Sequence, residues 1–149
     1  MVWGAFCSQK KTPLIFLKGK QTSKRYVRVI KKHLLPIYKI EENENIWFQQ
    51  DNAPIHKSNY TMEALQNLPF DLLNWPPYSP DLNPIENIWS ILVYKIYTKK
   101  KFYRNTDELK ESILEAWEEI DLQTLQNLVD SMEDRLEKVI INRGDAIDY

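Results

Sequence analysis

Apolar residues near the start of the chain fall into two short runs and one helical stripe. Val2–Phe6 and Pro13–Leu17 predict two strands, and the polar residues 8–12 between them predict a hairpin connection. Thr22 or Ser23 is a candidate N-cap for a helix that Pro36 would end. The apolar positions of that helix have helical spacing: Tyr26, Val27, Ile30 and Leu34.

The middle of the chain alternates strand, helix and strand. The polar residues 41–45 predict a turn, and Ile46–Gln50 predicts a strand that runs up to Asp51. A helix is expected from about Ser58, with Met62 and Leu65 facing inward. The segment 70–75 predicts a further strand, so the region from Ile46 to Leu73 fits a right-handed crossover between parallel strands.

Three helical stripes follow in the last third of the chain. One helix is expected to begin near Pro84, one at a Thr106 cap, and one at an Asp121 cap. We expect these side chains to be buried: Ile85, Ile88, Trp89, Leu92, Ile96, Leu109, Ile113, Ala116, Trp117, Ile120, Leu125, Leu128, Val129, Met132, Leu136 and Val139. The element order predicts an α/β layered domain over residues 1–149, with a core over about 1–98 and closing helices over about 105–141.

Composition and charge narrow the functional classes. The chain has 149 residues, 43% of them hydrophobic, which suffices for a core. One cysteine, Cys7, cannot form an internal disulfide, which favours a reducing intracellular compartment. No apolar run approaches the ~20 residues of a membrane span. Residues 1–40 hold ten Lys or Arg and no acid, whereas residues 105–149 hold four basic and thirteen acidic residues. The basic front is either a solvated surface or a phosphate-binding one.

Asp51 and Glu86 are the candidate catalytic and metal-binding residues. Asp51 would lie just past the carboxyl end of a central strand, where sites form in open α/β sheets, and carboxylates suit Mg²⁺. Asp51 also has a simpler interpretation as a turn residue. Glu86 is the third residue of a helix that Asn83 would cap, so it also fits a capping box in which it would bond back to the Asn83 amide.

Asn52 and His56 lie within a few residues of Asp51. His56 is either a third ligand, a proton carrier, or a residue that shapes the turn or contacts substrate. Hard-cation chemistry favours oxygen ligands, so His56 is not assigned as a ligand. Asn52 and His56 are therefore candidate nucleic-acid contacts, together with a set of basic residues: Lys10, Lys11, Lys24, Arg25 and Arg28.

Two motifs resemble those of the Tc1/mariner-type DNA transposases. Gln49–His56 is similar to the segment around their second catalytic aspartate, and Trp75–Trp89 is similar to the segment around their third carboxylate. The 34 residues between Asp51 and Glu86 match the spacing of the Tc1 branch. Trp3-Gly4 and Pro13–Phe16 resemble the preceding strands, and Leu109–Ile141 resembles the closing helices.

The resemblance implies a ribonuclease-H-like catalytic domain that cuts transposon ends and joins them into target DNA at TA steps. Asp51 and Glu86 would be the second and third of three carboxylates that hold two Mg²⁺ or Mn²⁺ ions. It also implies DNA as partner, a possible homodimer, and residence in the nucleus.

The first catalytic aspartate of that family has no counterpart here, since the first acidic residue is Glu41. We therefore expect a truncated catalytic domain that lacks the first strand and the N-terminal DNA-binding region, and that is inactive alone. The alternative is a non-catalytic remnant of a mobile element that binds DNA or a protein through residues 1–40.

Overall fold

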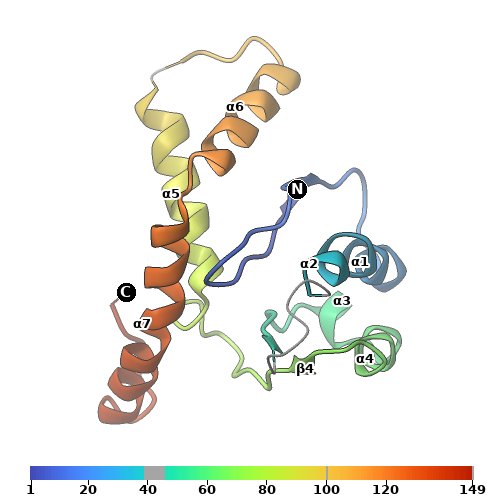
Figure 1. The fold of residues 1–149 in the computed structure, drawn as a ribbon, viewed down its shortest axis with the longest axis vertical. Coiled ribbons are helices and arrows are strands. Elements are labelled where there is room, and N and C mark those ends of the chain that lie inside the picture. Colours follow the sequence, from blue (N-terminus) through green and yellow to red (C-terminus); the bar gives the residue numbers. More distant parts are fainter. Residues whose placement is uncertain (39–45, 100, 149) are drawn as a thin grey trace. The chain divides into compact units, whose positions relative to one another are not determined.

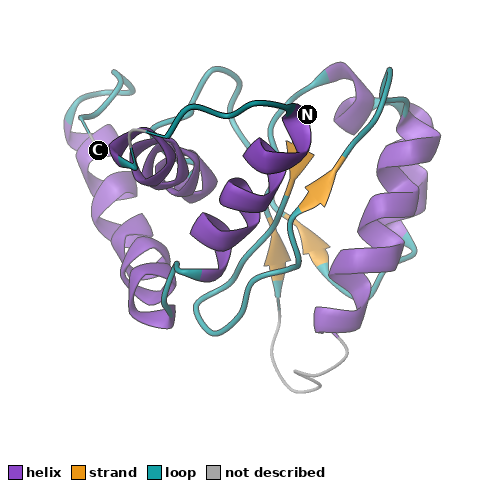
Figure 2. Cartoon of the chain, turned by 90° about the horizontal axis from the view of Figure 1, so that it is seen from above, coloured by secondary structure: helices purple, strands orange, loops and turns teal. Residues whose placement is uncertain are grey.

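The computed structural model describes residues 1–38, 46–99 and 101–148. They divide into two compact units, one formed by Met1–Ala5 and Ile15–Ser79, the other by Phe6–Leu14 and Pro80–Tyr149. Helices make up most of the described chain, and its strands are short (Figure 2). The predicted turn at residues 41–45 lies outside the described residues, and the single-domain organisation stays a prediction.

Two strand pairs lie in the first unit. β1 (Val2–Trp3) pairs antiparallel with β2 (Ile15–Phe16), which confirms the predicted hairpin. β3 (Trp47–Phe48) pairs parallel with β4 (Asp71–Leu72), as expected for a crossover connection. The strands are shorter than the apolar runs that predicted them.

The first helical region continues past the predicted stop. α1 (Ser23–Val29) is capped by the Thr22 side chain, then passes into the π-helical segment η1 (Ile30–Leu34) and α2 (Leu35–Tyr38). The prediction that Pro36 ends the helix was wrong. Pro36 is the second residue of α2, and a proline in the first turn of a helix is tolerated because that turn does not need its N–H.

Two helices connect β3 to β4. α3 (Pro54–Lys57) is a short helix for which the sequence made no prediction, and the Ala53 carbonyl accepts the amide hydrogens of His56 and Lys57 at 2.8 and 3.1 Å. α4 (Asn59–Gln66) begins at the predicted Ser58 cap. Leu65 is buried as expected, whereas Met62 is only half-buried. The core of this unit consists of Tyr26, Ile30, Leu65 and Phe70.

The second unit contains three longer helices. α5 (Pro84–Thr98), α6 (Thr106–Glu118) and α7 (Leu122–Ile141) begin close to the predicted positions, and α5 contacts both others (Figure 1). Asp121 caps α7 as predicted. Asn105, not Thr106, caps α6: its side-chain oxygen accepts the amide hydrogens of Asp107 and Glu108 at 3.0 and 2.9 Å. An amide or carboxylate oxygen one residue earlier competes well for these donors.

The buried face of α7 differs from the predicted stripe. Leu125 is buried, but Val129 and Leu136 are exposed. Ser131 and Arg135 are buried in their place. Hydrophobic periodicity does not reveal this polar face, and Arg135 uses it to bind Asn87, the neighbour of Glu86 in the sequence.

No helix within the described ranges is both long and apolar enough to cross a membrane.

Candidate metal and nucleic-acid site

Asp51 lies three residues beyond the end of β3. Its Oδ1 atom accepts the Ala53 amide hydrogen at 3.0 Å, so Asp51 does act as the turn residue that its local sequence indicates. Its side chain nevertheless remains 60% exposed. In the described chain no hydrogen bond occupies Oδ2, so one carboxylate oxygen is available to a ligand.

His56 holds the same oxygen of Asp51. The Nδ1 atom of His56 lies 2.5 Å from Oδ1, and the His56 side chain is only 17% exposed. An ionised carboxylate can only accept hydrogen bonds, so Nδ1 is the donor. The structure therefore makes His56 an orienting partner of Asp51, held at its Nδ1 atom.

Tyr26 supports this arrangement from α1. Its ring centroid lies 4.0 Å from that of His56, and its hydroxyl donates to Oε1 of Gln50 at 2.6 Å. Burial, and to a smaller extent the charge of Asp51, raises the pKa of Tyr26. The phenol thus stays a neutral donor that fixes both the strand end and the imidazole. Tyr26 appeared in the sequence only as part of an apolar stripe.

Asn52 joins the ends of the two parallel strands. Its Nδ2 atom donates to the carbonyl of Trp75 at 3.0 Å, and Trp75 follows β4. Because parallel strands end at one edge of their sheet, this bond fixes the backbone on which Asp51 stands. The structure gives Asn52 a positioning role, while its predicted contact with nucleic acid stays a prediction.

Glu86 lies in the first turn of α5, and the predicted capping box is not formed. The Asn83 amide donates to the Pro80 carbonyl at 3.0 Å, so it is not the partner of the Glu86 carboxylate. Glu86 is exposed, and within the described residues no hydrogen bond or ion pair holds its carboxylate. The capping interpretation of Glu86 was wrong, and its two oxygens are available.

A buried arginine fixes the start of α5. Arg135 of α7 is 1% exposed, and its guanidinium donates to the Asp81 carbonyl at 2.8 Å, to Oδ1 of Asn87 at 3.0 Å and to Oγ of Ser131 at 3.0 Å. Asp81 in turn accepts the Ile147 amide hydrogen at 3.0 Å. Asn87 is the neighbour of Glu86, so Arg135 ties α7 to the turn that carries the candidate ligand.

The carboxylates fit a hard divalent cation by their chemistry. Each offers oxygen donors that are exposed, and Mg²⁺ is commonly held by one or two carboxylates plus water and substrate oxygens. The described residues contain no group of three or more His, Cys, Asp or Glu side chains placed to hold a metal. Asp51 belongs to the first unit and Glu86 to the second, so their predicted pairing stays a prediction.

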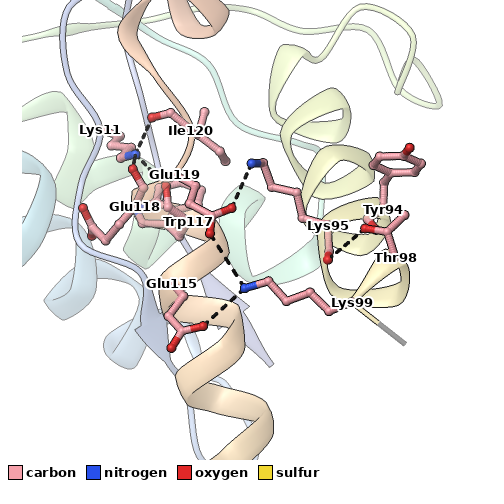
Figure 3. Close-up of polar contacts among 10 residues, drawn as sticks. All are labelled: Lys11, Tyr94, Lys95, Thr98, Lys99, Glu115, Trp117, Glu118, Glu119 and Ile120. Carbon is pink, nitrogen blue, oxygen red and sulfur yellow. Dashed lines mark hydrogen bonds and ion pairs between the residues drawn. The ribbon is translucent and has the colours of Figure 1, made fainter. Parts of the chain in front are cut away.

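Lys11 has a structural role in the second unit. Its Nζ atom donates to the carbonyls of Trp117, Glu118 and Ile120 at 2.5, 3.1 and 2.6 Å (Figure 3). Trp117 also donates from Nε1 to the Thr12 carbonyl at 2.9 Å. Burial lowers the pKa of Lys11. Its ammonium group thus donates hydrogen bonds to the unpaired backbone carbonyls at the carboxyl end of α6 and has few N–H groups left for a phosphate.

The other basic candidates fall into two groups. Arg25 donates to the carbonyls of Lys18 and Lys20 at 3.2 and 2.9 Å, which closes the loop before α1, and Lys10 is half-buried in the hairpin. Lys24 and Arg28 are exposed on α1, and the same face continues through η1 with exposed Lys31 and Lys32. We call Lys24, Arg28, Lys31 and Lys32 the α1–η1 basic face.

Comparison with known proteins identifies a family over most of the chain. Residues 1–110 match the family described as "DDE superfamily endonuclease". The chain is 44% identical over 149 residues to the Tc3 transposase of Caenorhabditis elegans, and 32% identical over the same length to the Tc1 transposase of that organism. It covers 45% and 54% of these relatives, so the chain spans about half their length.

Solved structures show the same fold. The catalytic domain of Mos1 mariner transposase, in a structure with raltegravir and Mg, matches 99% of this chain and 75% of its own with a TM-score of 0.80 and 20% identity. The Mos1 paired-end complex with left transposon end matches 99% of this chain and 44% of its own, with a TM-score of 0.77. The predicted ribonuclease-H-like α/β fold is thereby confirmed.

Proposed function

Because this chain belongs to the DDE superfamily endonucleases, in the Tc1/mariner transposase branch, we propose that it contributes to metal-dependent cleavage and joining of DNA strands. In this proposal Asp51 and Glu86 are metal ligands. The observation that carries it is that both carboxylates of the two motifs are exposed, and each keeps at least one oxygen with no hydrogen bond in the described chain.

The metal ions that these ligands would bind are Mg²⁺ or Mn²⁺. The Mos1 transposase catalytic domain has solved structures with raltegravir and Mn and with raltegravir and Mg. Such ions, when bound, activate a water or 3′-hydroxyl for in-line attack on a phosphodiester and stabilise the leaving oxygen. In this proposal Asp51 and Glu86 supply negative charge and the oxygen atoms that coordinate the metal. His56 and Arg135 hold in place the segments that carry these two carboxylates.

The α1–η1 basic face is the proposed contact with the DNA backbone. Its four cations are exposed, and residues 1–40 contain no acidic residue to compete with a phosphate. Cations recurring on one side of a helical segment neutralise neighbouring phosphates and release counterions. Lys11 is excluded from this face because three backbone carbonyls occupy its ammonium donors, and Arg25 is left out because its Nη1 atom closes the loop before α1.

Further parts of the proposal follow from the relatives rather than from these residues. They are transposon ends and TA steps as substrates, a homodimer, and residence in the nucleus. The 149 residues alone are proposed to be inactive, since two carboxylates rather than three match the motifs of the family.

Manganese binding and plasmid nicking together test the proposal. We expect Mn²⁺ titration, followed by electron paramagnetic resonance, to show binding that weakens about tenfold or more in both Asp51→Asn and Glu86→Gln. Glu63→Gln, an exposed carboxylate on α4, is the matched control and should bind normally. Binding that survives in both site variants would contradict the assignment. Nicking by this chain above the level of Glu86→Gln would contradict its proposed inactivity.

A further inference from the structure

The exposed side of α5 forms one continuous stripe that begins at Glu86. Five exposed residues recur at three- and four-residue intervals: Glu86, Ser90, Val93, Tyr94 and Tyr97. We call this set the Glu86 stripe. The buried residues of the same helix, Ile88 and Leu92, lie on its other side, as expected from a rotation of roughly 100° per residue. A molecule that reaches Glu86 therefore has a straight path along the helix.

Two members of the Glu86 stripe are large aromatic side chains. Tyr94 is 70% exposed and Tyr97 is 77% exposed. Thr98 donates to the backbone carbonyl of Tyr94 at 2.9 Å, but no hydrogen bond or ring contact engages either aromatic ring within the described residues. Figure 3 shows the Tyr94 ring directed away from the ion pairs between α5 and α6. Both rings are free to stack with a flat partner.

Basic residues recur around the C-terminal end of α5, close to Tyr94 and Tyr97 along the chain. Lys95 pairs with Glu119, which directly follows α6, at 2.9 Å, and Lys99 pairs with Glu115 of α6 at 3.3 Å (Figure 3). The hydrogen bond from Lys95 lowers the pKa of Glu119, which favours the charged carboxylate that the ion pair needs. Glu115 and Glu119 are thus each paired with a lysine at this end of α5. Beyond α5, Lys101 and Arg104 are exposed cations.

We propose that Tyr94 and Tyr97 form a stacking platform for unpaired bases of the DNA strand whose phosphodiester lies at Glu86. This inference deepens the proposed function and rests on it for the identity of the strand. Aromatic rings bind every base through its π-face, and a cationic surround attracts the backbone, which is the combination typical of single-strand binding.

The spacing along the helix agrees with a strand of DNA. At a rise of about 1.5 Å per residue, Tyr94 and Tyr97 lie about 12 and 16 Å from Glu86 along the axis. Stacked nucleotides repeat at about 3.4 Å per strand, so the platform lies roughly three to five nucleotides from the phosphodiester, and fewer where bases are unstacked. A double helix keeps its bases paired, so the platform selects frayed or single-stranded DNA.

The test compares ring removal with hydroxyl removal. The variants are Tyr94→Ala/Tyr97→Ala and the control Tyr94→Phe/Tyr97→Phe, which keeps both rings. The probe is a mixed-sequence single-stranded oligonucleotide containing 2-aminopurine, whose fluorescence falls when it stacks, alongside a blunt duplex of the same sequence. Since both tyrosines are exposed, neither variant should change the thermal midpoint measurably.

We expect the double alanine variant to lose roughly fivefold or more in affinity for the single strand and to lose the quenching. The phenylalanine variant should bind as the wild type does, and duplex affinity should change little. Unchanged binding by the alanine variant, an equal loss in the phenylalanine variant, or no binding by the wild type would each overturn the inference. A wild-type dimer in sedimentation that the alanine variant loses would also overturn it, by making a second copy the occupant.

Failure of the proposed function would look different. Glu86→Gln should retain the 2-aminopurine quenching because it keeps both rings. Mn²⁺ binding that survives in both Asp51→Asn and Glu86→Gln, with the quenching intact, would contradict only the proposed function, whereas Mn²⁺ binding that depends on both carboxylates, with no quenching by the wild type, would contradict only the stacking platform.

Discussion

The Nδ1 atom of His56 lies 2.5 Å from Oδ1 of Asp51, and the imidazole ring packs against the buried ring of Tyr26. The turn thus presents Asp51 with one oxygen fixed by His56 and the Ala53 amide, while the other makes no hydrogen bond within the described residues. Metal ligands that are carboxylates are usually oriented by such partners. His56 is therefore a positioning residue for the Asp51 carboxylate.

Replacing His56 tests that role. His56→Ala removes the donor to Oδ1 and should weaken Mn²⁺ binding about tenfold, because an unrestrained carboxylate loses orientation. His56→Asn is the matched variant, since its amide nitrogen replaces Nδ1 in reach of Asp51. We expect it to restore most of the affinity. Equal metal affinity in His56→Ala and the wild type, measured by titration, would remove His56 from the site.

Arg135 should contribute strongly to stability. Arg135→Met removes a buried guanidinium and leaves the partly buried Asp81 carbonyl and Asn87 amide oxygen without their donor, so the free energy of unfolding should fall by about 3 kcal/mol. Urea denaturation measures the change. Arg143→Met, on an exposed residue after α7, serves as the comparison and should change stability by less than about 0.5 kcal/mol. Similar losses in both variants would contradict the role of Arg135.

Alkaline pH should destabilise the fold through Tyr26. The pKa of this phenol is raised in the folded chain, so the unfolded chain loses its proton first as the pH rises above about 10. The contribution of Tyr26 is complete below that pH and declines above it, by up to about 1.4 kcal/mol per pH unit. Tyr26→Phe should flatten this decline in thermal melts between pH 9 and 11, while the exposed Tyr97→Phe should not. Parallel declines in both variants would contradict the buried phenol as its source.

Salt should weaken DNA binding through the α1–η1 basic face. For duplex DNA, each phosphate contact contributes about 0.9 to the slope of log affinity against log salt concentration. Lys24→Gln, Arg28→Gln and Lys31→Gln should each lower the slope by about one such contact. Lys11→Gln should reduce thermal stability but leave the slope unchanged, because its ammonium binds the end of α6. An equal slope change in Lys11→Gln would show that this division of the cations is wrong.

The hydrophobic pattern anticipated the element order because its stripes are long on α5, α6 and α7. It failed where polar groups decide the conformation. The stripe of α7 predicted Leu136 as buried, but Arg135 is buried since three oxygens satisfy its guanidinium. Pro36 did not stop its helical region, since it follows the π-helical turn as the second residue of α2, and proline is tolerated in the first turn of a helix.

The motifs and their spacing indicate Asp51 and Glu86 as candidate metal ligands, and their shared site stays a prediction. The residues that hold these two segments in place carry less signal in the sequence. The capping box predicted for Glu86 is absent because Pro80 takes the Asn83 amide, a contact that the spacing of polar residues does not show. Tyr26 and Arg135 come from α1 and α7, far along the chain from the carboxylates they support, so local patterns carry no signal for them.

Iron-directed cleavage of the polypeptide is the most direct measurement of whether Asp51 and Glu86 share a metal site. Fe²⁺ substitutes for Mg²⁺ or Mn²⁺ and, with peroxide and ascorbate, releases hydroxyl radicals that cut the chain beside the bound ion. We expect cuts near residues 51 and 86 in the wild type, competed by excess Mn²⁺, and loss of both sets of cuts in Asp51→Asn and in Glu86→Gln. Cuts near only one carboxylate, or loss of only the local set in each variant, would contradict a shared site.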